Sequence, residues 1–160
     1  MTTESAPRLK LPPRWFVRAA WVVHRAIYRI TGGPRGLWKP QPGRWGTMRL
    51  TTIGRKTGVE RQAILGYYED GPNLVTMAMN GWAEPEPAWW LNLQACPDVT
   101  VELKDGMRMV RGRAADGPER DRLWARWKEM GDDPDGYAWR RSRETAVVVL
   151  EPRPPIQQQP

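Results

Sequence analysis

Two cations and a hydroxyl group lie together in one short, glycine-flanked segment of the chain, Gly54-Arg55-Lys56-Thr57-Gly58. The segment lies between two stretches that alternate in the manner of β-strands, which predicts a turn presenting these side chains and its backbone N–H groups. Such groups bind anions. Basic residues in hairpin turns also serve only to keep a sheet edge soluble, and the segment lacks the Gly-x-x-x-x-Gly-Lys-Ser/Thr spacing of a P-loop. The turn is therefore a candidate anion site that needs support from elsewhere in the chain.

Aromatic residues follow this candidate anion site in the sequence. Asn80-Gly81-Trp82 reads as a loop, and the stretch from Pro87 to Leu93 reads as a short helix rich in aromatic residues. Indole rings either fill a core or stack on planar ligands, and a glycine lets a ligand approach the backbone closely. The two regions together favour a ligand with an anionic part and a flat ring.

Conventional catalytic residues are scarce. The single histidine, His24, lies in the N-terminal region, which disfavours a Ser-His-Asp or Cys-His arrangement, and no residue set predicts a metal site. Glu84 and Glu86 are candidates for an acid pair, although solvated loop carboxylates are the better interpretation. Cys96, the only cysteine, excludes an internal disulfide and reads as a small hydrophobe rather than a nucleophile. If the chain is an enzyme, a cofactor must supply the reactive chemistry.

The composition sets further limits on function. The 160 residues carry a net charge of +7, which predicts attraction to polyanions, acidic cofactors or anionic lipid. A nucleic-acid partner is not expected, because no recognised nucleic-acid module accompanies the charge. The chain has no apolar run of about 18 residues and no cleavable signal peptide, so we expect a cytoplasmic protein.

Residues 14–30 have a strongly amphipathic pattern. On a helix, the arginines of this stretch fall on one narrow stripe and apolar residues occupy the remaining surface. The helix would pack against the domain or a dimer partner, or would dock on an anionic membrane surface at the inner face of the cell membrane. Before it, residues 1–13 read as a flexible leader, and after it residues 31–46 read as a Gly/Pro-rich connector.

The remaining chain reads as one domain over residues 47–151, followed by a disordered tail at residues 152–160. Alternating or β-branched runs predict six strands, near residues 47–53, 60–69, 74–79, 99–104, 107–115 and 146–150. Helical patterns cover residues 88–95, 118–130 and 134–143. Six strands with interspersed helices indicate an α+β or small-barrel domain.

The order of these motifs resembles the deazaflavin-dependent nitroreductase family of actinobacteria. The resemblance rests on Leu50-Thr51-Thr52-Ile53 running into the basic turn, Asn80-Gly81, the stretch from Pro87 to Leu93, Pro97, and Val147-Val148-Val149-Leu150. It spans residues 37–152 and implies an α+β split β-barrel, FMN-binding-like or pyridoxamine-phosphate-oxidase-like, with about six antiparallel strands. It also implies the 8-hydroxy-5-deazaflavin coenzyme F420 as cofactor, with FMN as the alternative.

The resemblance implies roles for particular residues. Arg55, Lys56 and Thr57 would hold the phosphate of the coenzyme and the start of its polyglutamate tail. Asn80 and Gly81 correspond to the loop beside the deazaflavin ring. The helix that closes over the ring corresponds to the segment containing Trp89, Trp90 and Asn92. Tyr137 matches a tyrosine of the substrate-side helix and is the catalytic candidate, and Trp82 and Trp139 would line the same substrate pocket.

The chain also departs from the family pattern. Trp82 stands where another small residue usually follows Asn-Gly, and Glu84 and Glu86 occupy the same loop. Thr145-Ala146 replaces the usual Ile-Pro before the last strand. Carboxylates that face an anionic coenzyme would weaken its binding, whereas carboxylates that point to water would have little effect. The position of the two glutamates therefore bears directly on cofactor binding.

The reaction implied by the resemblance is hydride transfer from reduced deazaflavin to a planar acceptor such as a quinone or a nitroaromatic compound. The alternatives are a non-catalytic deazaflavin-binding or carrier protein and an FMN-binding split-barrel protein. The expected partners are a small-molecule acceptor, an anionic membrane surface reached through residues 14–30, and a second copy of the chain in a homodimer.

Overall fold

The structure, a computed structural model, describes residues 36–81, 84–131 and 133–154. The expected leader, the amphipathic helix at residues 14–30 with His24, the first part of the connector, Trp82 and the end of the tail lie outside the described residues. The domain boundaries before residue 36 therefore stay predictions. In the described part of the connector, Leu37 is buried and Trp38 forms an isolated β-bridge with Thr47.

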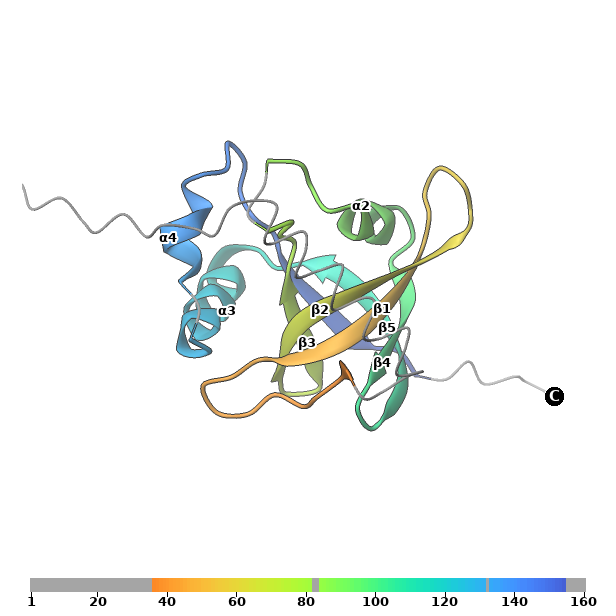
Figure 1. Ribbon diagram of the computed structural model, residues 1–160, viewed down its shortest axis with the longest axis horizontal. Coiled ribbons are helices and arrows are strands. Elements are labelled where there is room, and N and C mark those ends of the chain that lie inside the picture. Colours follow the sequence, from red (N-terminus) through yellow and green to blue (C-terminus); the bar gives the residue numbers. More distant parts are fainter. Residues whose placement is uncertain (1–35, 82–83, 132, 155–160) are drawn as a thin grey trace, which may run out of the picture.

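Six antiparallel strands close into a barrel in the order β1-β2-β3-β6-β5-β4 (Figure 1). Their bounds lie within two residues of the sequence prediction and are, in chain order, β1 Gly46–Ile53, β2 Glu60–Asp70, β3 Asn73–Met77, β4 Asp98–Leu103, β5 Gly106–Ala114 and β6 Val147–Pro152. The expected α+β architecture, a barrel of six antiparallel strands with short helices, is confirmed.

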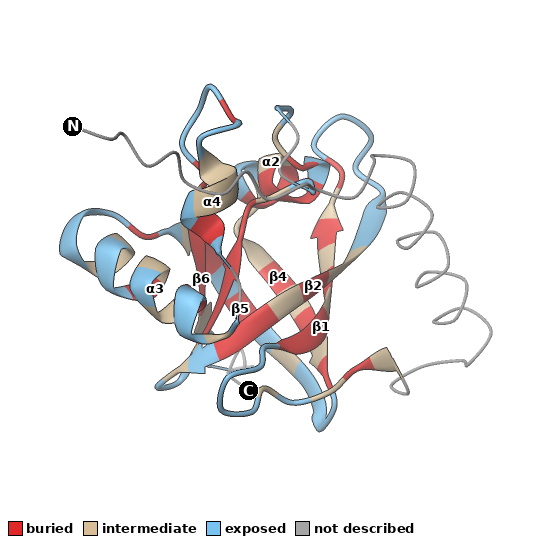
Figure 2. Cartoon of the chain, turned by 60° about the vertical axis from the view of Figure 1, so that its left-hand side comes forward, coloured by how far each residue is buried: buried red, intermediate tan, exposed pale blue. Residues whose placement is uncertain are grey.

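Alternation along the strands builds two apolar layers. In β4 every second residue is buried, and these side chains join residues such as Met48 and Leu50 inside the barrel. Outward-facing residues of β2, β3 and β6 pack against helix α3, Gly117–Glu129, through Leu123 and Trp127. Figure 2 shows buried stretches along β1 and β6 and an exposed outer side on α3. No described helix has the length and apolarity needed to cross a bilayer.

Within the closed barrel, the pairing between β2 and β3 is short. This strand pairs with β1 over the whole of Glu60–Tyr67, but it pairs with β3 only over Tyr68–Asp70. Among the described residues, the other edge of the first part of β2 therefore has no strand partner. An unpaired strand edge presents backbone N–H and C=O groups to whatever lies beside it.

Helix α2, Ala88–Ala95, lies across one end of the barrel (Figure 1). It begins after Pro87, whose fixed φ of −63° and missing N–H suit the entry to a helix. The helix packs closely on β5, because a Cβ atom on Gly112 would lie 2.5 Å from Cδ2 of Leu93. Gly112 is therefore required for the position of α2.

The third predicted helix is shorter than expected. Helix α4 covers Pro134–Ala138, so the prediction of a helix to residue 143 was wrong beyond Ala138. Two further hydrogen bonds of the i to i+3 type, donated by the N–H groups of Arg140 and Arg141, continue the turn before the chain leaves the helix. The chain turns here because the side chain of Arg141 is buried against the β3 end of the barrel, where it bonds the carbonyl oxygen of Ala78.

Candidate functional site

A cavity of about 740 Å³ lies along the unpaired edge of β2, and we call it the large cavity. Arg61 to Leu65, five consecutive residues of β2, line it. Successive side chains of a strand point to opposite faces of the sheet. Consecutive residues can therefore line the same cavity only where the cavity runs along the edge of the strand. The rest of the lining comes from the turn after β1, the residues after β3 and the start of α2, and comprises Thr52, Gly54, Arg55, Lys56, Thr57, Met79, Asn80, Gly81, Pro87, Ala88, Trp89 and Asn92.

The predicted turn between β1 and β2 is present and covers residues 54–59; we call it the basic turn. The N–H of Gly54 donates to the carbonyl of Val59 at 2.8 Å, and the N–H of Gly58 donates to the carbonyl of Gly54 at 2.7 Å. Gly58 has a φ of +69°, which favours glycine. The N–H groups of Gly54 and Gly58 are therefore bonded within the turn, although the sequence predicted that the backbone N–H groups of the turn would be available to an anion. The anion-binding groups of the turn are therefore mainly its side chains.

Asn92 of α2 holds the basic turn in place. Its Oδ1 accepts hydrogen bonds from the backbone N–H of Arg55 at 3.1 Å and from Nη1 of Arg55 at 3.2 Å. Its Nδ2 donates to Oγ1 of Thr52 at 3.4 Å. The side chain of Asn92 is buried, and protein groups bind its oxygen and one N–H of its amide nitrogen. Asn92 was predicted to bind the cofactor, and the structure places it where it orients Arg55.

One end of the large cavity is strongly cationic. Arg55, Lys56 and Arg61 line it, and no described carboxylate forms an ion pair with any of them. None of the described residues that line the cavity is acidic. Sequence reasoning missed Arg61, although its place as the second residue of β2, directly after the basic turn, was a usable signal. Three cations at one end of a cavity form an anion site.

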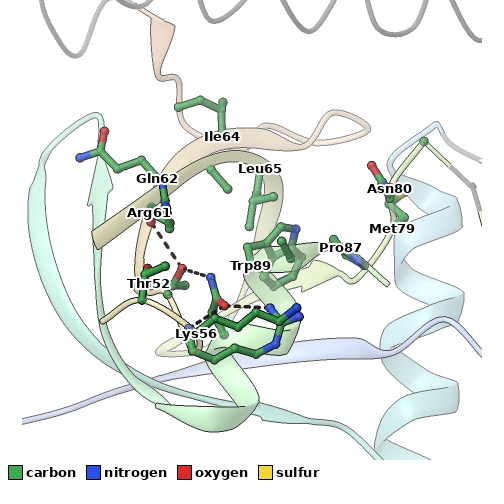
Figure 3. A pocket seen from close by; sticks show the side chains of 17 residues that line it. Thr52, Lys56, Arg61, Gln62, Ile64, Leu65, Met79, Asn80, Pro87 and Trp89 are labelled. Atoms are coloured by element: carbon green, nitrogen blue, oxygen red, sulfur yellow. Dashed lines mark hydrogen bonds between the residues drawn. The ribbon is translucent and has the colours of Figure 1, made fainter. Parts of the chain in front are cut away.

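The other end of the large cavity is apolar and aromatic. Leu65, Met79 and Trp89 line it together with Asn80 and Gly81. In the view of Figure 3, Lys56 and Asn80 lie at opposite ends of the lining with Trp89 between them. The cavity therefore has an anion-binding end and a surface suited to a flat ring.

Trp90, also predicted to bind the cofactor, has a different place. It does not line the large cavity and packs in the core of the barrel. Its ring meets that of Trp89 edge to face, with centroids 6.3 Å apart. Trp90 thus supports Trp89, and only Trp89 faces the cavity.

A second cavity of about 370 Å³, the small cavity, adjoins the first. The two share Ile64, Leu65, Met79 and Gly81 as lining residues. The remaining described lining is mostly apolar, includes no charged side chain, and comprises Trp38, Trp45, Thr47, Gly66, Thr76, Met77 and Trp127. An apolar cavity thus opens beside the ring-binding end of a partly cationic one.

Two of the predicted substrate residues, Tyr137 and Trp139, do not line either cavity. Tyr137 is half-buried in α4, and Trp139 is 73% exposed with the guanidinium of Arg140 stacked 5.4 Å from its ring centroid. Trp82 lies outside the described residues. The structure therefore groups the basic turn, Asn80, Gly81 and Trp89, and leaves Tyr137 and Trp139 apart from them.

The two loop glutamates turn away from the large cavity. Oε1 of Glu86 pairs with Nη2 of Arg141 at 2.8 Å, and the carboxylate of Glu84 accepts hydrogen bonds from the N–H and Oγ of Ser142 at 2.9 and 2.8 Å. The bonds from Ser142 lower the pKa of Glu84 below its usual range. Each carboxylate has its own partner, so they do not form an acid pair. No metal-binding cluster of His, Cys, Asp or Glu occurs in the part of the chain that the structure describes.

Comparison with known proteins agrees with this geometry. Residues 21–152 match the sequence profile of the F420H(2)-dependent quinone reductase family. An F420H(2)-dependent quinone reductase of Mycobacterium tuberculosis is 33% identical over 147 residues, which cover 88% of this chain and 97% of the relative. The match therefore extends over almost the whole of both proteins.

Solved structures show the same architecture. An F420-H2 dependent reductase has a TM-score of 0.60 and 26% identity over 66% of this chain and 93% of its own. A second structure, of a domain-swapped dimer, has a TM-score of 0.62 at 24% identity, covers 84% of this chain and 99% of its own, and shows the fold alone. The split β-barrel, the oxidoreductase activity and the F420 cofactor expected from the sequence are confirmed. The chain belongs to the F420H(2)-dependent quinone reductase family.

Proposed function

We propose that this protein transfers a hydride from reduced F420 to a planar, apolar acceptor of the quinone type. The observation that carries the proposal is the pair of adjoining cavities, which share Leu65 and Met79 but differ in character. The large cavity suits a coenzyme with a flat ring and an anionic tail. The small cavity suits an uncharged, apolar partner for that ring.

The residues of the large cavity fit the coenzyme. Arg55, Lys56 and Arg61 would hold its phosphate and carboxylate groups, because these three cations line the cavity without a carboxylate partner among the described residues. Thr57 adds a hydroxyl group to the same end. Trp89 and the backbone at Gly81 would hold the ring, which also lies beside the free edge of β2.

The chemistry needs little from the protein beyond placement. When bound, reduced F420 supplies a hydride from C5 of its ring, and the acceptor takes up that hydride and one proton to become a quinol. Leu65, Met79 and Trp89 would exclude water from the apolar end of the cavity and would hold the two reactants close together. Solvent at the cavity mouth supplies the proton, since the described lining contains no acid and Tyr137 lies outside it.

The small cavity supports an apolar acceptor. Its lining of Trp38, Trp45, Met77 and Trp127 has no charge to attract an ionic substrate. The family and the mycobacterial relative are both named as quinone reductases, which agrees with this chemistry. A nitroaromatic acceptor has a similar planar ring and is the second candidate.

The test is a binding and turnover experiment with the purified full-length protein. Quenching of F420 fluorescence should give a dissociation constant of about 1 μM or tighter, with much weaker binding of FMN. Reduced F420 should then be oxidised by menadione faster than by a nitroaromatic compound. Arg55→Glu/Lys56→Glu should abolish coenzyme binding, and unchanged affinity in this double variant would contradict the assigned anion site.

Binding without turnover would support the carrier alternative, whereas preference for FMN would support the flavin alternative. The family assignment favours neither of these two alternatives. Both outcomes are read from the same purified sample.

We also propose that the protein is cytoplasmic and reaches its apolar acceptor at an anionic membrane surface. Residues 1–35 carry seven Lys or Arg and one Glu, so most of the excess positive charge of the chain lies there. Sedimentation with anionic liposomes should be lost when Arg14, Arg18, Arg25 and Arg29 are all changed to Glu, and neutral liposomes should not bind the wild-type protein. Persistent binding of the fourfold variant to anionic liposomes would contradict the proposal. Light scattering of the same samples tests the expected homodimer.

A further inference from the structure

Arg141 is a fully buried cation with three partners. Its Nη1 donates to the carbonyl oxygen of Ala78 at 3.2 Å and to Oγ1 of Thr145 at 2.8 Å. Its Nη2 pairs with Oε1 of Glu86 at 2.8 Å, and the side chain of Arg141 is 0% exposed. None of these groups lines the large cavity.

The partners of Arg141 lie at the two ends of one connection. Ala78 directly follows β3, and the next three residues of the chain line the large cavity. Glu86 directly precedes Pro87, which lines the same cavity and is the N-cap of α2. A single guanidinium therefore ties together the points at which the chain leaves β3 and enters α2.

The neighbouring residue strengthens this arrangement. Ser142 binds Glu84 through its N–H and Oγ, so two consecutive residues hold the same connection. Ala78 is also held by its own N–H, which donates to the carbonyl oxygen of Ala146 at 2.9 Å. The segment after α4 is thus hydrogen-bonded to both ends of the connection between β3 and α2, at Ala78 on one side and at Glu84 and Glu86 on the other.

Stability alone is a poor explanation for this buried pair. Nε of Arg141 and Oε2 of Glu86 are buried, and neither has a hydrogen-bond partner among the described residues. Replacing a buried ion pair by apolar side chains of similar volume is often neutral or stabilising, because the desolvation of two charges offsets their attraction. A pair with two unsatisfied atoms is therefore expected to add little to the free energy of unfolding. Its contribution lies in specifying one geometry.

We propose that Arg141 is a positioning residue for hydride transfer, acting with Glu86. It fixes the cavity-lining residues 79–81 and 87 relative to β2, and these residues border the ring-binding end of the large cavity. The inference rests on the proposed function, because it takes the ring of F420 to lie at that end. Arg141 itself touches neither coenzyme nor acceptor.

The position of Arg141 predicts which kinetic constant changes. Coenzyme affinity comes mainly from the cations of the basic turn and Arg61, which do not contact Arg141 and stay in place when it is changed. The rate of transfer depends on the distance and angle between the reacting carbon atoms, and a displacement of about 1 Å can lower it about 100-fold. Loss of the Arg141 bonds should therefore lower kcat much more than F420 affinity.

The experiment compares Arg141→Met, Arg141→Lys and Glu86→Gln with the full-length protein. Arg143→Met is the matched control, because Arg143 is exposed and lies two residues away. For each protein we measure F420 affinity by fluorescence quenching, kcat and KM with menadione, and Tm. We expect Arg141→Met to lower kcat by about tenfold or more while the F420 Kd changes less than about threefold. Arg141→Lys should recover part of the rate, because an ammonium group keeps the charge but cannot reproduce the geometry of the guanidinium.

Three results would overturn the proposal. The first is an unchanged kcat in folded Arg141→Met, and the second is a fall in kcat that only matches the fraction of protein unfolded, as judged from Tm. The third is a fall in kcat for Arg143→Met as large as that for Arg141→Met. If Arg141→Met does not fold, the proposal is tested with Glu86→Gln, because this substitution keeps the shape of the Glu86 side chain and removes its charge. A lower kcat at unchanged F420 affinity then supports the positioning role, and an unchanged kcat refutes it. Failure of the wild-type protein to bind F420 contradicts the proposed function instead, so the two failures are distinguishable.

Discussion

Oδ1 of Asn92 accepts hydrogen bonds from both the backbone N–H and the guanidinium of Arg55, at 3.1 and 3.2 Å. The two residues lie on different elements, helix α2 and the basic turn, and 37 positions separate them in the chain. A buried amide thus fixes a surface cation at the mouth of the large cavity. Because Oδ1 of Asn92 accepts two hydrogen bonds from Arg55, we expect its effect on the coenzyme to be exerted mainly through Arg55.

Asn92→Ala is expected to weaken F420 binding without abolishing it. The substitution releases Arg55 but keeps its charge, so we expect a loss of about 1 kcal/mol, or roughly fivefold in Kd. Fluorescence titration measures the change. Gln94→Ala, an exposed position on the same helix, is the control and should bind as the wild type does. A loss comparable to removal of Arg55 itself would instead indicate direct contact between Asn92 and the coenzyme.

The cations of the large cavity should make F420 binding dependent on salt. Arg61→Gln is expected to raise the Kd about threefold to tenfold and to reduce its dependence on ionic strength. Lys104→Gln is the control, because it removes an equal charge and should leave the Kd unchanged. Lys104 lies in the β4–β5 hairpin, which the strand pairing places at the opposite end of β1 from the basic turn. Titration at several salt concentrations measures both quantities. Equal effects of the two substitutions would mean that overall charge, rather than a local site, attracts the coenzyme.

Asp70 should make the stability of the fold dependent on pH. Its carboxylate accepts hydrogen bonds from Arg122 at 2.8 and 2.9 Å and from Arg126 at 3.0 Å, and these bonds, led by that from Arg122, lower its pKa. A carboxylate with a lowered pKa stabilises the fold above its unfolded pKa of about 3.9, and the contribution disappears as the pH falls through the folded pKa.

Asp70→Asn should therefore lower the free energy of unfolding at pH 7, and its difference from wild type should shrink below about pH 4. Urea unfolding at a series of pH values measures this. Asp121→Asn, which removes an exposed carboxylate from the same helix that carries Arg122 and Arg126, is the control. A difference that stays constant with pH would show that the charge of Asp70 is not involved.

The close approach of Gly112 to Leu93 predicts a pair of compensating substitutions. Gly112→Ala places a methyl group 2.5 Å from Cδ2 of Leu93, so the Leu93 side chain or α2 must shift, and we expect a loss of about 1–3 kcal/mol in unfolding free energy. The shift should also raise the F420 Kd, because α2 carries Trp89 and Asn92. Adding Leu93→Val should restore part of both properties. Purely additive losses in the double variant would contradict the assigned contact.

Tyr137 provides a test of where the proton comes from. A general acid in the transition state contributes about 100-fold or more to the rate. Because Tyr137 does not line the large cavity, we expect Tyr137→Phe to retain kcat with menadione within about threefold. Steady-state kinetics at several pH values measure this. A loss near 100-fold would restore Tyr137 as the catalytic acid, as the resemblance implied.

Local patterns predicted the fold and one half of the site. The two-residue period of the strands and the glycines of the basic turn are properties of adjacent residues, and they determine β1, β2 and the position of Arg55 and Lys56. The same pattern did not distinguish Trp89 from Trp90. Their burial is nearly the same, and only the orientation of α2 on the barrel decides which indole ring faces the cavity.

Pairings between distant residues were beyond local reasoning. Glu86 and Arg141 are 55 positions apart, and the sequence suggested for Glu86 only a solvated loop carboxylate. Only the closure of the barrel brings the end of β3 and the segment after α4 together. The apparent conflict between Glu86 and an anionic coenzyme therefore has a structural answer that the sequence did not contain.

The unpaired edge of β2 also affects how separate copies of the protein meet. A strand with free N–H and C=O groups is a template for pairing with an edge from another molecule, which is a route to aggregation. Arg55, Lys56 and Arg61 stand at the beginning of this edge and repel a second copy through their like charge. In the proposed complex, F420 covers the edge and neutralises the same cations. On this reading, charge repulsion would keep copies apart before the coenzyme binds, and the bound coenzyme would cover the described edge of β2 afterwards.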